Sequence, residues 1–350
     1  MDIRKIQKTG GSTFVVSLPK KWISSMGLKK NDSVMIQLQP DSSLVIRPQG
    51  DSNGAPRERL QKTLLINEDS TRHLPRELIG CYVMGYEIIK LEAQKFVSQD
   101  IRNIVREFTS LVMGFEIVDE TVTEITLKDI MNPNELPFKT SIKRMFNIVK
   151  SMHGNMLVSL DQVNREMAKN VVSMDFEVNK LYWFVFRQLN NILRSPVLMT
   201  RDHERTVTHK SALNYLFIAR ILERVGDHTG NICKAILDLP DDEVSEEIVQ
   251  ETKRLATEGF NILEKTMATL FSKDIMFLNS VFDSVEALKP QLKQLRQKVQ
   301  EKDLAHALQF GLILDSIRRK GEYTKDIAEH MINHIVDSDS YPPQAGKKKK

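Results

Sequence analysis

Two carboxylates stand one helical turn apart in the segment "ARILERVGDHTGNI", residues 219–232. Glu223 and Asp227 have the spacing i and i+4, so on a helix both side chains project from one face. Carboxylates placed in this way can bind one metal ion, and hard oxygen ligands favour Fe(III), Mn or Mg, although zinc also accepts them. Without other context, the alternative is a solvated acidic pair beside Arg220 and Arg224.

The segment belongs to a helical region that runs from about residue 137 to residue 337. Apolar residues recur there every three or four positions over six long stretches, which clusters of Gly, Pro and Asp separate. The predicted helices are residues 138–160, 167–193, 207–237, 246–271, 276–299 and 305–336. Two sets of three long helices indicate a duplication.

An internal repeat supports the duplication. Residues 209–236 align with residues 304–331 at an offset of 95 without a gap, and the alignment contains seven identities that gather around the carboxylate pair. We therefore predict two tandem three-helix bundles, over residues 137–239 and 243–337.

The segment "LERVGDHTGNI" resembles the repeated metal motif of the PhoU family, Glu/Asp-x-x-x-Asp in the typical context L-E-R-I-G-D-H-A-x-N-I. The resemblance implies a multinuclear cluster of iron or zinc on the bundle surface, held by these carboxylates and by acidic residues of the preceding helix. Asn179 stands where the family has its second aspartate on that helix. The implied ligands are Glu223, Asp227, Asp175 and Glu177.

The second repeat departs from this motif. Arg318 stands where the first carboxylate is expected, and its positive charge would repel a metal ion. We therefore expect one cluster site and one degenerate half. Weaker metal candidates are Glu322, Asp326, Asp283 with Glu286 beside it, and His228. A hydrogen-bonded surface or interface histidine is the alternative interpretation of His228.

Residues 1–48 are predicted to form a small β-rich unit. Two stretches, residues 12–19 and 32–48, are rich in β-branched residues, and the turn signal "PDSS" divides the second one. Pro19 can begin a short helix between them and Gly27 can end it. So small a unit cannot bury much surface alone, and we expect it to pair with a second copy.

Positive charge gathers in this part of the chain. Residues 1–50 hold eight Lys and Arg against three Asp, whereas the whole chain has a net charge of +4. The stretch "RKIQKTGGSTFVVSLPKKWISSMGLKKNDSVMIQL" resembles the SpoVT/AbrB swapped-hairpin domain, in which two chains interleave strands into a barrel that binds DNA. The residues that would face DNA by this resemblance are Arg4, Lys5, Lys8, Ser12, Thr13, Lys20 and Lys21. A solvated basic surface is the alternative.

Three further segments complete the predicted organisation. Residues 49–59 are dense in Gly, Pro, Ser and Asn and are predicted to be a linker. Residues 60–131 follow the order β-α-β-α-β(β), which indicates a small α+β layer with a structural or dimerising role. Residues 338–350 form a basic tail that we expect to be disordered.

Several function classes are disfavoured. No stretch approaches the length of an apolar membrane span and no apolar run resembles a secretion signal, so we expect a cytoplasmic protein. Its two cysteines are far apart and indicate neither a disulfide framework nor a thiolate site. Glu-x-x-His pairs, phosphate loops and nucleotide fingerprints are all missing from the sequence, so we expect no enzyme activity, including that of a ferritin-like metalloenzyme.

Together these patterns predict a mainly α protein with a β-rich N-terminal domain: a dimeric swapped-hairpin barrel, a small α+β middle domain and two tandem three-helix bundles. The combined resemblances imply a homodimeric regulator that represses phosphate-uptake genes when phosphate is plentiful. One alternative is a PhoU-type regulator of a phosphate ABC transporter or its sensor proteins, in which the N-terminal domain only dimerises. The other is an antitoxin-like autoregulator, which the absence of an obvious toxin-wrapping tail disfavours.

Overall fold

The computed structural model describes the chain in two compact units, residues 1–59 and residues 60–350. The described residues are 3–38, 43–49, 59–131, 136–194, 201–202, 205–206, 209–240, 244–270 and 274–337. Residues 50–58 of the predicted linker and the whole predicted tail lie outside them. Among the described helices, none combines the length and the apolar character that crossing a membrane requires.

The first unit consists of two hairpins and a short helix. Its elements are β1 (Gln7–Thr9), β2 (Thr13–Val15), α1 (Lys20–Ser25), β3 (Val34–Leu38) and β4 (Leu44–Pro48). β1 pairs antiparallel with β2, and β3 pairs antiparallel with β4. Gly10 in the first hairpin and Gly27 after α1 have φ values of 68° and 65°, which glycine adopts without steric cost. The β-rich character predicted for this part of the chain is confirmed.

The described side chains of this unit form no buried core. Of its residues whose side chains the structure describes, none is buried. Phe14 is 67% exposed and Ile36 is 62% exposed, although both lie in strands. Neither a swapped-hairpin barrel nor a dimer follows from one chain, so both stay predictions.

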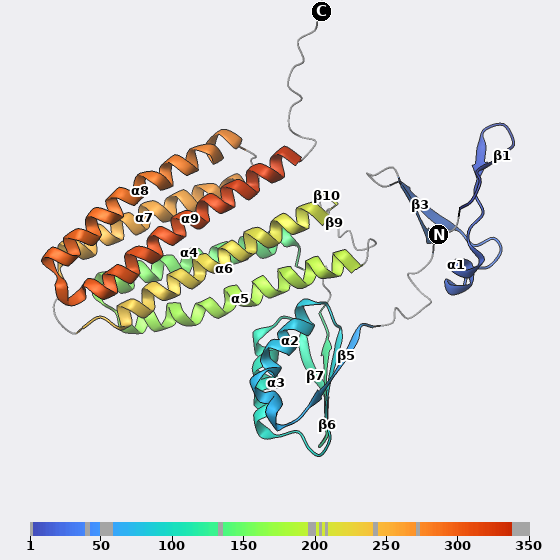
Figure 1. Ribbon diagram of the computed structural model, residues 1–350, viewed down its shortest axis with the longest axis horizontal. Helices are drawn as coiled ribbons and strands as arrows, with labels where there is room; N and C mark the ends of the chain where they lie inside the picture. Colours follow the sequence, from blue (N-terminus) through green and yellow to red (C-terminus); the bar gives the residue numbers. More distant parts are fainter. Residues whose placement is uncertain are drawn as a thin grey trace, which may run out of the picture. The chain divides into compact units, whose positions relative to one another are not determined.

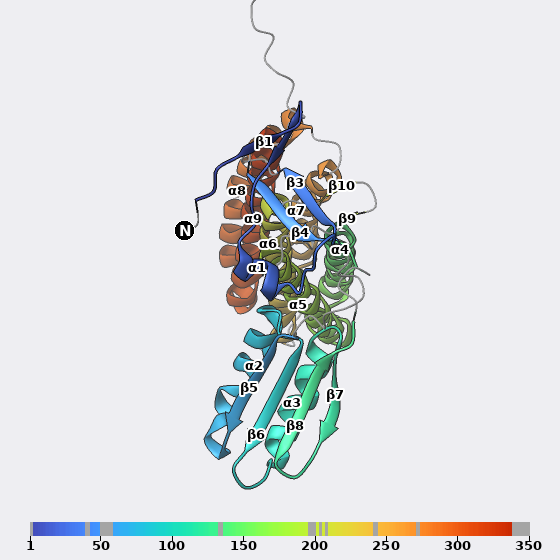
Figure 2. The same ribbon diagram turned by 90° about the vertical axis from the view of Figure 1, so that its right-hand side faces the viewer.

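The second unit begins with a four-stranded sheet whose order is β5-β6-β8-β7 (Figure 2). Its elements are β5 (Gln61–Ile66), the 3-10 helix η1 (Glu68–Arg72), α2 (Leu74–Val83), β6 (Ile88–Ala93), α3 (Gln99–Leu111), β7 (Phe115–Glu120) and β8 (Glu124–Asp129). β5 and β6 are parallel, and β8 is antiparallel to both of its neighbours. The small α+β layer predicted here is present, and we call residues 60–131 the sheet domain.

Six long helices follow and lie along one another (Figure 1). They are α4 (Phe138–Gln162), α5 (Arg165–Arg194), α6 (His209–Leu237), α7 (Glu246–Thr269), α8 (Ile275–Lys302) and α9 (Ala307–Asp337). The short elements β9 (Arg201–Asp202), β10 (Arg205–Thr206) and the 3-10 helix η4 (Leu304–His306) lie between them. One continuous apolar core joins all six helices, and α6 packs directly against α9. The predicted helices are confirmed, whereas the predicted boundaries of the two bundles stay predictions.

The repeat seen in the sequence extends to packing. Thr229 and its repeat partner Thr324 are both fully buried, and each donates a hydrogen bond to the carbonyl four residues earlier, at 2.8 and 2.9 Å. Gly226 and its repeat partner Gly321 each lie against a neighbouring helix, α5 and α8 respectively. The two halves therefore use the same close helix approach.

Helix α5 contributes side chains to two hydrophobic cores. Its segment "LYWFVF" is apolar around the whole helix, which predicts a buried position. Leu181 and Val185 belong to the bundle core, whereas Trp183 and Phe186 pack against the core of the sheet domain. The buried Arg187 follows directly and binds carbonyls of the sheet domain. Both sides of this segment of α5 are covered, which explains why the segment has no polar face.

Candidate functional site

The groove between α5 and α6 brings three of the predicted ligands together. Asp175 comes from α5, and Glu223 and Asp227 come from α6. Gly226 lies between the two α6 residues, and a Cβ atom there would be 3.2 Å from Asp175 Oδ1 and 3.6 Å from Val178. Because glycine has no side chain, α5 can approach closely enough to bring Asp175 to the carboxylates of α6.

The burial of Glu223 and Asp175 costs folding free energy when no metal ion is bound. Glu223 is only 7% exposed; its Oε1 accepts a hydrogen bond from Arg220 at 2.8 Å, while its Oε2 is buried without a hydrogen-bond partner. Asp175 Oδ2 accepts a hydrogen bond from Asn179 at 3.1 Å, while its Oδ1 is likewise buried and unpartnered. Burial, and next the charge of Asp227, raise the pKa of Glu223 to about 7 and that of Asp175 to about 6.

A cleft of about 270 Å³ opens beside these residues. Its lining consists of Val172, Asp175, Asp227, Gly230, Asn231 and Lys234. A Cβ atom built on Gly230 would meet no atom within 4 Å. The missing side chain of Gly230 therefore contributes to the space in front of the carboxylates, and we call this space the Gly230 cleft.

The residues present fit a metal ion. Buried carboxylate oxygens normally have hydrogen-bond partners. The two oxygens here that have none are places where a cation would be stabilised. Among the residues that the structure describes, no three His, Cys, Asp or Glu side chains already surround one metal position. Arg220 holds Oε1 of Glu223, so Oε2 is the oxygen that is left for a metal ion.

Two other predicted ligands lie elsewhere. Glu177 is exposed and lies two residues after Asp175, a spacing at which helical side chains point in different directions. His228 Nδ1 lies 3.3 Å from the hydroxyl of Ser316, and its ring lies 5.6 Å from that of Tyr323, both on α9. The structure thus places His228 at the contact between the two halves, as the alternative interpretation expects.

The second half shows what replaces the carboxylates. Val285 of α8 lies against Gly321, just as Val178 of α5 lies against Gly226. If these valines are matched, Phe282 takes the position of Asp175. An apolar ring therefore stands where the first half has a buried carboxylate.

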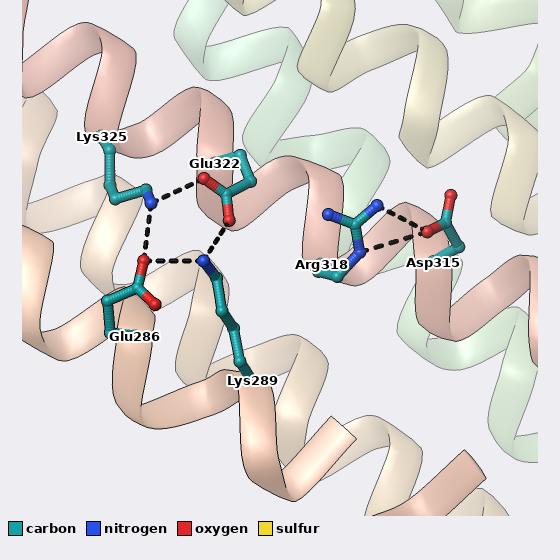
Figure 3. A network of polar contacts seen from close by, with 6 residues as sticks. All are labelled: Glu286, Lys289, Asp315, Arg318, Glu322 and Lys325. Carbon is teal, nitrogen blue, oxygen red and sulfur yellow. Dashed lines mark hydrogen bonds and ion pairs between the residues drawn. The ribbon is translucent and has the colours of Figure 1, made fainter. Parts of the chain in front are cut away.

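Two lysines neutralise the acidic residues of this half (Figure 3). Lys289 Nζ lies 2.7 Å from Glu286 and 2.9 Å from Glu322, and Lys325 Nζ lies 2.8 Å and 2.6 Å from the same two residues. Lys325 occupies the position of Gly230 in the repeat. We call these four residues the lysine–glutamate network. Its ammonium groups contact the carboxylates directly, where a metal ion would otherwise bind.

The remaining second-half candidates lie outside this network. Arg318 pairs with Asp315 at 2.8 Å, which reverses the order of charges in the Arg220–Glu223 pair of the first half (Figure 3). Asp283 and Asp326 are exposed. The predicted asymmetry between the halves is thus consistent with the side-chain contacts, although the metal ligands themselves stay a prediction.

Sequence reasoning overlooked the roles of Gly230, Lys289 and Lys325. The offset of 95 already places Lys325 opposite Gly230, so one signal was present in the repeat. Lys289 could not be found in the same way, because the connections before α6 and α9 differ in length and the offset does not extend to α5 and α8.

The predicted DNA-binding residues are all exposed. Ser12 lies in the turn between β1 and β2, and Lys20 and Lys21 begin α1. In the β1–β2 register Lys8 is opposite Phe14, so Lys8 and Thr13 lie on different faces of this hairpin. Arg4 and Lys5 precede β1. One chain therefore presents these residues on more than one side of the unit.

Comparison with known proteins relates both parts of the chain to protein families. The PhoU domain matches residues 142–236, and the family "Antidote-toxin recognition MazE, bacterial antitoxin" matches residues 7–53. A protein from Clostridium acetobutylicum named "Phosphate-specific transport system accessory protein PhoU homolog" is 30% identical over 188 residues, which cover 52% of this chain and 78% of that protein. A "PhoU homolog 1" from Thermotoga maritima is 19% identical over 202 residues, 55% of this chain and 84% of that protein.

Two solved structures are similar to part of this chain. PhoU from Streptococcus pneumoniae has a TM-score of 0.48 at 17% identity, and the match covers 57% of this chain and 93% of that one. PhoU from Pseudomonas aeruginosa has a TM-score of 0.45 at 16% identity, with 57% and 95% covered.

These relationships bear on the family of the helical body and on whether the protein is an enzyme. The helical body carries the carboxylates in the segment that resembles the family motif, and the relative of 30% identity is covered over 78% of its length. The family is regulatory, in agreement with the expectation that this protein is not an enzyme. The chain belongs to the PhoU family and carries an additional MazE/AbrB-like domain at its N-terminal end.

Proposed function

We propose that this protein is a DNA-binding regulator of phosphate uptake. The N-terminal unit binds promoter DNA as a dimer, and the helical body responds to phosphate status, with repression when phosphate is plentiful. The observation that carries the proposal is the fusion, in one chain, of a basic MazE/AbrB-like unit with a PhoU body. The printed name of the Clostridium acetobutylicum relative supports the link to phosphate transport.

The exposure of apolar side chains in the N-terminal unit supports the proposal that this unit dimerises. Exposed apolar side chains on its strands, such as Phe14, Val15 and Ile36, have no apolar interior to enter within one chain. Burial of such side chains stabilises a fold by about 25 cal/mol for each Å² removed from water. Interleaved strands of two copies would bury these side chains together, which supports the swapped-hairpin dimer.

DNA binding by such a dimer should depend steeply on salt. Five basic residues in each arm give about ten phosphate contacts, so the log–log slope of affinity against salt should be on the order of −9. Replacing Lys20 and Lys21 with alanine removes four of these charges, and we expect a slope of about −5. Fluorescence anisotropy with promoter DNA over a range of salt concentrations measures both slopes. Sedimentation of the variant as a dimer would show that its arms still pair, and an unchanged slope would exclude these lysines from the interface.

The cellular experiment is chromatin immunoprecipitation at high and at low phosphate. Peaks upstream of phosphate-transport genes that change with phosphate support the proposed function. If the protein is well expressed but enriches no site in either condition, the alternative is favoured. In that case a phosphate ABC transporter or its sensor proteins would be the partner, and the N-terminal domain would serve only for dimerisation.

For the helical body we propose a metal site formed by Asp175, Glu223 and Asp227. Two of these carboxylates have buried oxygens without partners, and Gly230 leaves space in front of them. The oxygen-only ligands suit hard cations such as Fe(III) or Mn, and zinc also accepts them. A multinuclear iron or zinc cluster is the form that the sequence motif implies. Glu177 would need a rearranged side chain to take part.

Metal affinity should rise with pH between about 5 and 8. In the metal-free protein the pKa of Asp175 is about 6 and that of Glu223 is about 7, so both carboxyls are largely protonated near pH 5 and a metal ion has to displace their protons. We expect dissociation constants at least roughly tenfold larger at about pH 5.5 than at about pH 7.5. Competition with a chromogenic chelator, calibrated at each pH, measures them. Equal affinity at both pH values would count against these ligands.

The same groups affect the stability of the metal-free protein in the opposite direction. Their folded pKa values lie above the ordinary values of 3.8 and 4.5, so the folded state binds protons more tightly than the unfolded state. Their contribution to stability therefore grows as the pH falls from about 7 towards about 4.

A further inference from the structure

The Gly230 cleft contains a cation as well as carboxylates. Lys234 lies seven residues after Asp227 on α6 and lines the same cleft as Asp175 and Asp227. Lys234 is exposed, whereas the two aspartates are partly buried. Within the described part of the chain, Lys234 makes no ion pair within 4 Å. Its charge still acts on Asp175, from the solvent side of the carboxylates.

The second half has the opposite order of charges. Asp326 and Glu329 occupy the repeat positions of Asn231 and Lys234, and both are exposed. In this half Lys289 and Lys325 pair with Glu286 and Glu322 between α8 and α9. The first half has acidic residues between α5 and α6 and the exposed Lys234 at the mouth of the cleft. This order suits a cation bound between the helices and an anion bound at the mouth of the cleft.

We propose that the metal-loaded cleft binds inorganic phosphate between the metal ion and Lys234, with the amide of Asn231 as a further donor. This inference rests on the metal site of the proposed function and names its ligand. Carboxylates alone repel a phosphate dianion, whereas a metal ion held by them attracts it. Lysine binds phosphate as a point charge, and the amide nitrogen of asparagine donates hydrogen bonds.

The geometry leaves room for both ligands. The cleft of about 270 Å³ is many times the volume of about 30 Å³ that one water molecule occupies in the liquid. The unpartnered Oδ1 of Asp175, which lines the cleft, marks the inner position for the cation. The absent side chain of Gly230 leaves space between this inner position and Lys234.

The test titrates the full-length protein in two steps. Mn²⁺ is added first and its affinity is measured by calorimetry; inorganic phosphate is then titrated into the manganese-loaded and the metal-free protein. The variant is Lys234→Met, and the matched control is Lys265→Met, because Lys265 is also an exposed helical lysine but lies on α7. We expect phosphate to bind the loaded wild-type protein at least about tenfold more tightly than the metal-free protein.

The variant should separate the two steps. We expect Lys234→Met to weaken phosphate binding about tenfold, the loss typical of one charge-assisted hydrogen bond, while Mn²⁺ affinity stays equal or rises slightly. The Lys265→Met control should bind both ligands like the wild type. If Mn²⁺ binds but phosphate affinity is unchanged in Lys234→Met, or sulfate binds as tightly as phosphate, this inference is overturned and the metal site stands. If neither Mn²⁺ nor any other metal ion binds, the metal site of the proposed function fails first.

Discussion

Gly230→Lys is expected to abolish metal binding in the first half of the body and, at the same time, to raise the melting temperature of the metal-free protein. The reason lies in the second half, where Lys325 occupies the equivalent position and contacts Glu286 and Glu322. A lysine at residue 230 would extend its ammonium group into the cleft beside Asp175 and Asp227. It would supply the positive charge that the carboxylates lack and would repel a metal ion.

Both effects follow from local observations. A Cβ atom at Gly230 meets no atom within 4 Å, so the new side chain has room to enter. Glycine inside a helix is about 0.8 to 1.0 kcal/mol less favourable than alanine, and lysine is close to alanine, so the substitution also favours the helix itself. The ammonium group of a lysine at residue 230 should also lower the pKa values of Asp175 and Glu223, which are raised in the wild type. The metal-free variant should therefore be more stable than the wild type near neutral pH.

The measurement combines metal analysis with thermal unfolding of the full-length protein. Gly154→Lys is the matched control, because Gly154 is an exposed glycine inside α4 whose Cβ would also meet no atom within 4 Å. This control should gain the same helix propensity and should keep the metal. Wild-type metal content in Gly230→Lys would show that the ion binds elsewhere. Loss of metal from both variants would show that added positive charge acts at a distance and not in the cleft.

The elements of the fold could largely be predicted because apolar periodicity and turn residues mark them. Helix α6 was expected over residues 207–237 and is found at His209–Leu237. The hairpin of β7 and β8 was harder to delimit, because its turn, Thr121–Thr123, contains no Gly, Pro, Asn or Asp. Thr121 forms the turn through side-chain and backbone hydrogen bonds with Glu124, which depend on residues that are common in strands.

The candidate site could be predicted only on α6, where the motif is local. Its partner Asp175 lies on another helix, and the sequence alone could not distinguish it from Glu177, which is two residues away. The close approach at Gly226 makes this choice, because it requires the facing side of α5 to lie against α6. The lysine–glutamate network is still harder to predict from the sequence, since Lys289 and Lys325 come from two helices and meet only after folding.

Contacts between the sheet domain and the helical body gave no sequence signal, yet they give the largest expected effect on stability. Arg187 is 3% exposed and donates hydrogen bonds to the carbonyls of Tyr82 and Tyr86, at 2.5 and 2.9 Å. It also pairs with Asp129 at 2.6 Å, and its guanidinium lies over the rings of Tyr82 and Phe115. Nothing in a single arginine within an apolar helix predicts that it binds another domain.

Arg187→Met is expected to destabilise the second unit by about 3 to 5 kcal/mol, the cost of removing one partner of a buried ion pair. Methionine roughly preserves the apolar stem, but Asp129 Oδ2 and the carbonyls of Tyr82 and Tyr86 lose the hydrogen bonds from Arg187. Urea unfolding followed by circular dichroism measures the loss. Arg106→Met is the control, because Arg106 is an exposed arginine on α3, and its effect should stay within about 0.5 kcal/mol.

A double-mutant cycle separates the ion pair from general packing. Asp129→Asn removes the charge that Arg187→Met leaves unpaired, so the double variant should be less destabilised than the sum of the two single variants. Additive effects would mean that the pair contributes little and that the carbonyl contacts dominate. Because Arg187 is on the same helix as the proposed ligand Asp175, loss of this contact also weakens the attachment of the sheet domain to that helix. Metal affinity measured in Arg187→Met would therefore show whether docking of the sheet domain holds α5 in the position that the metal site requires.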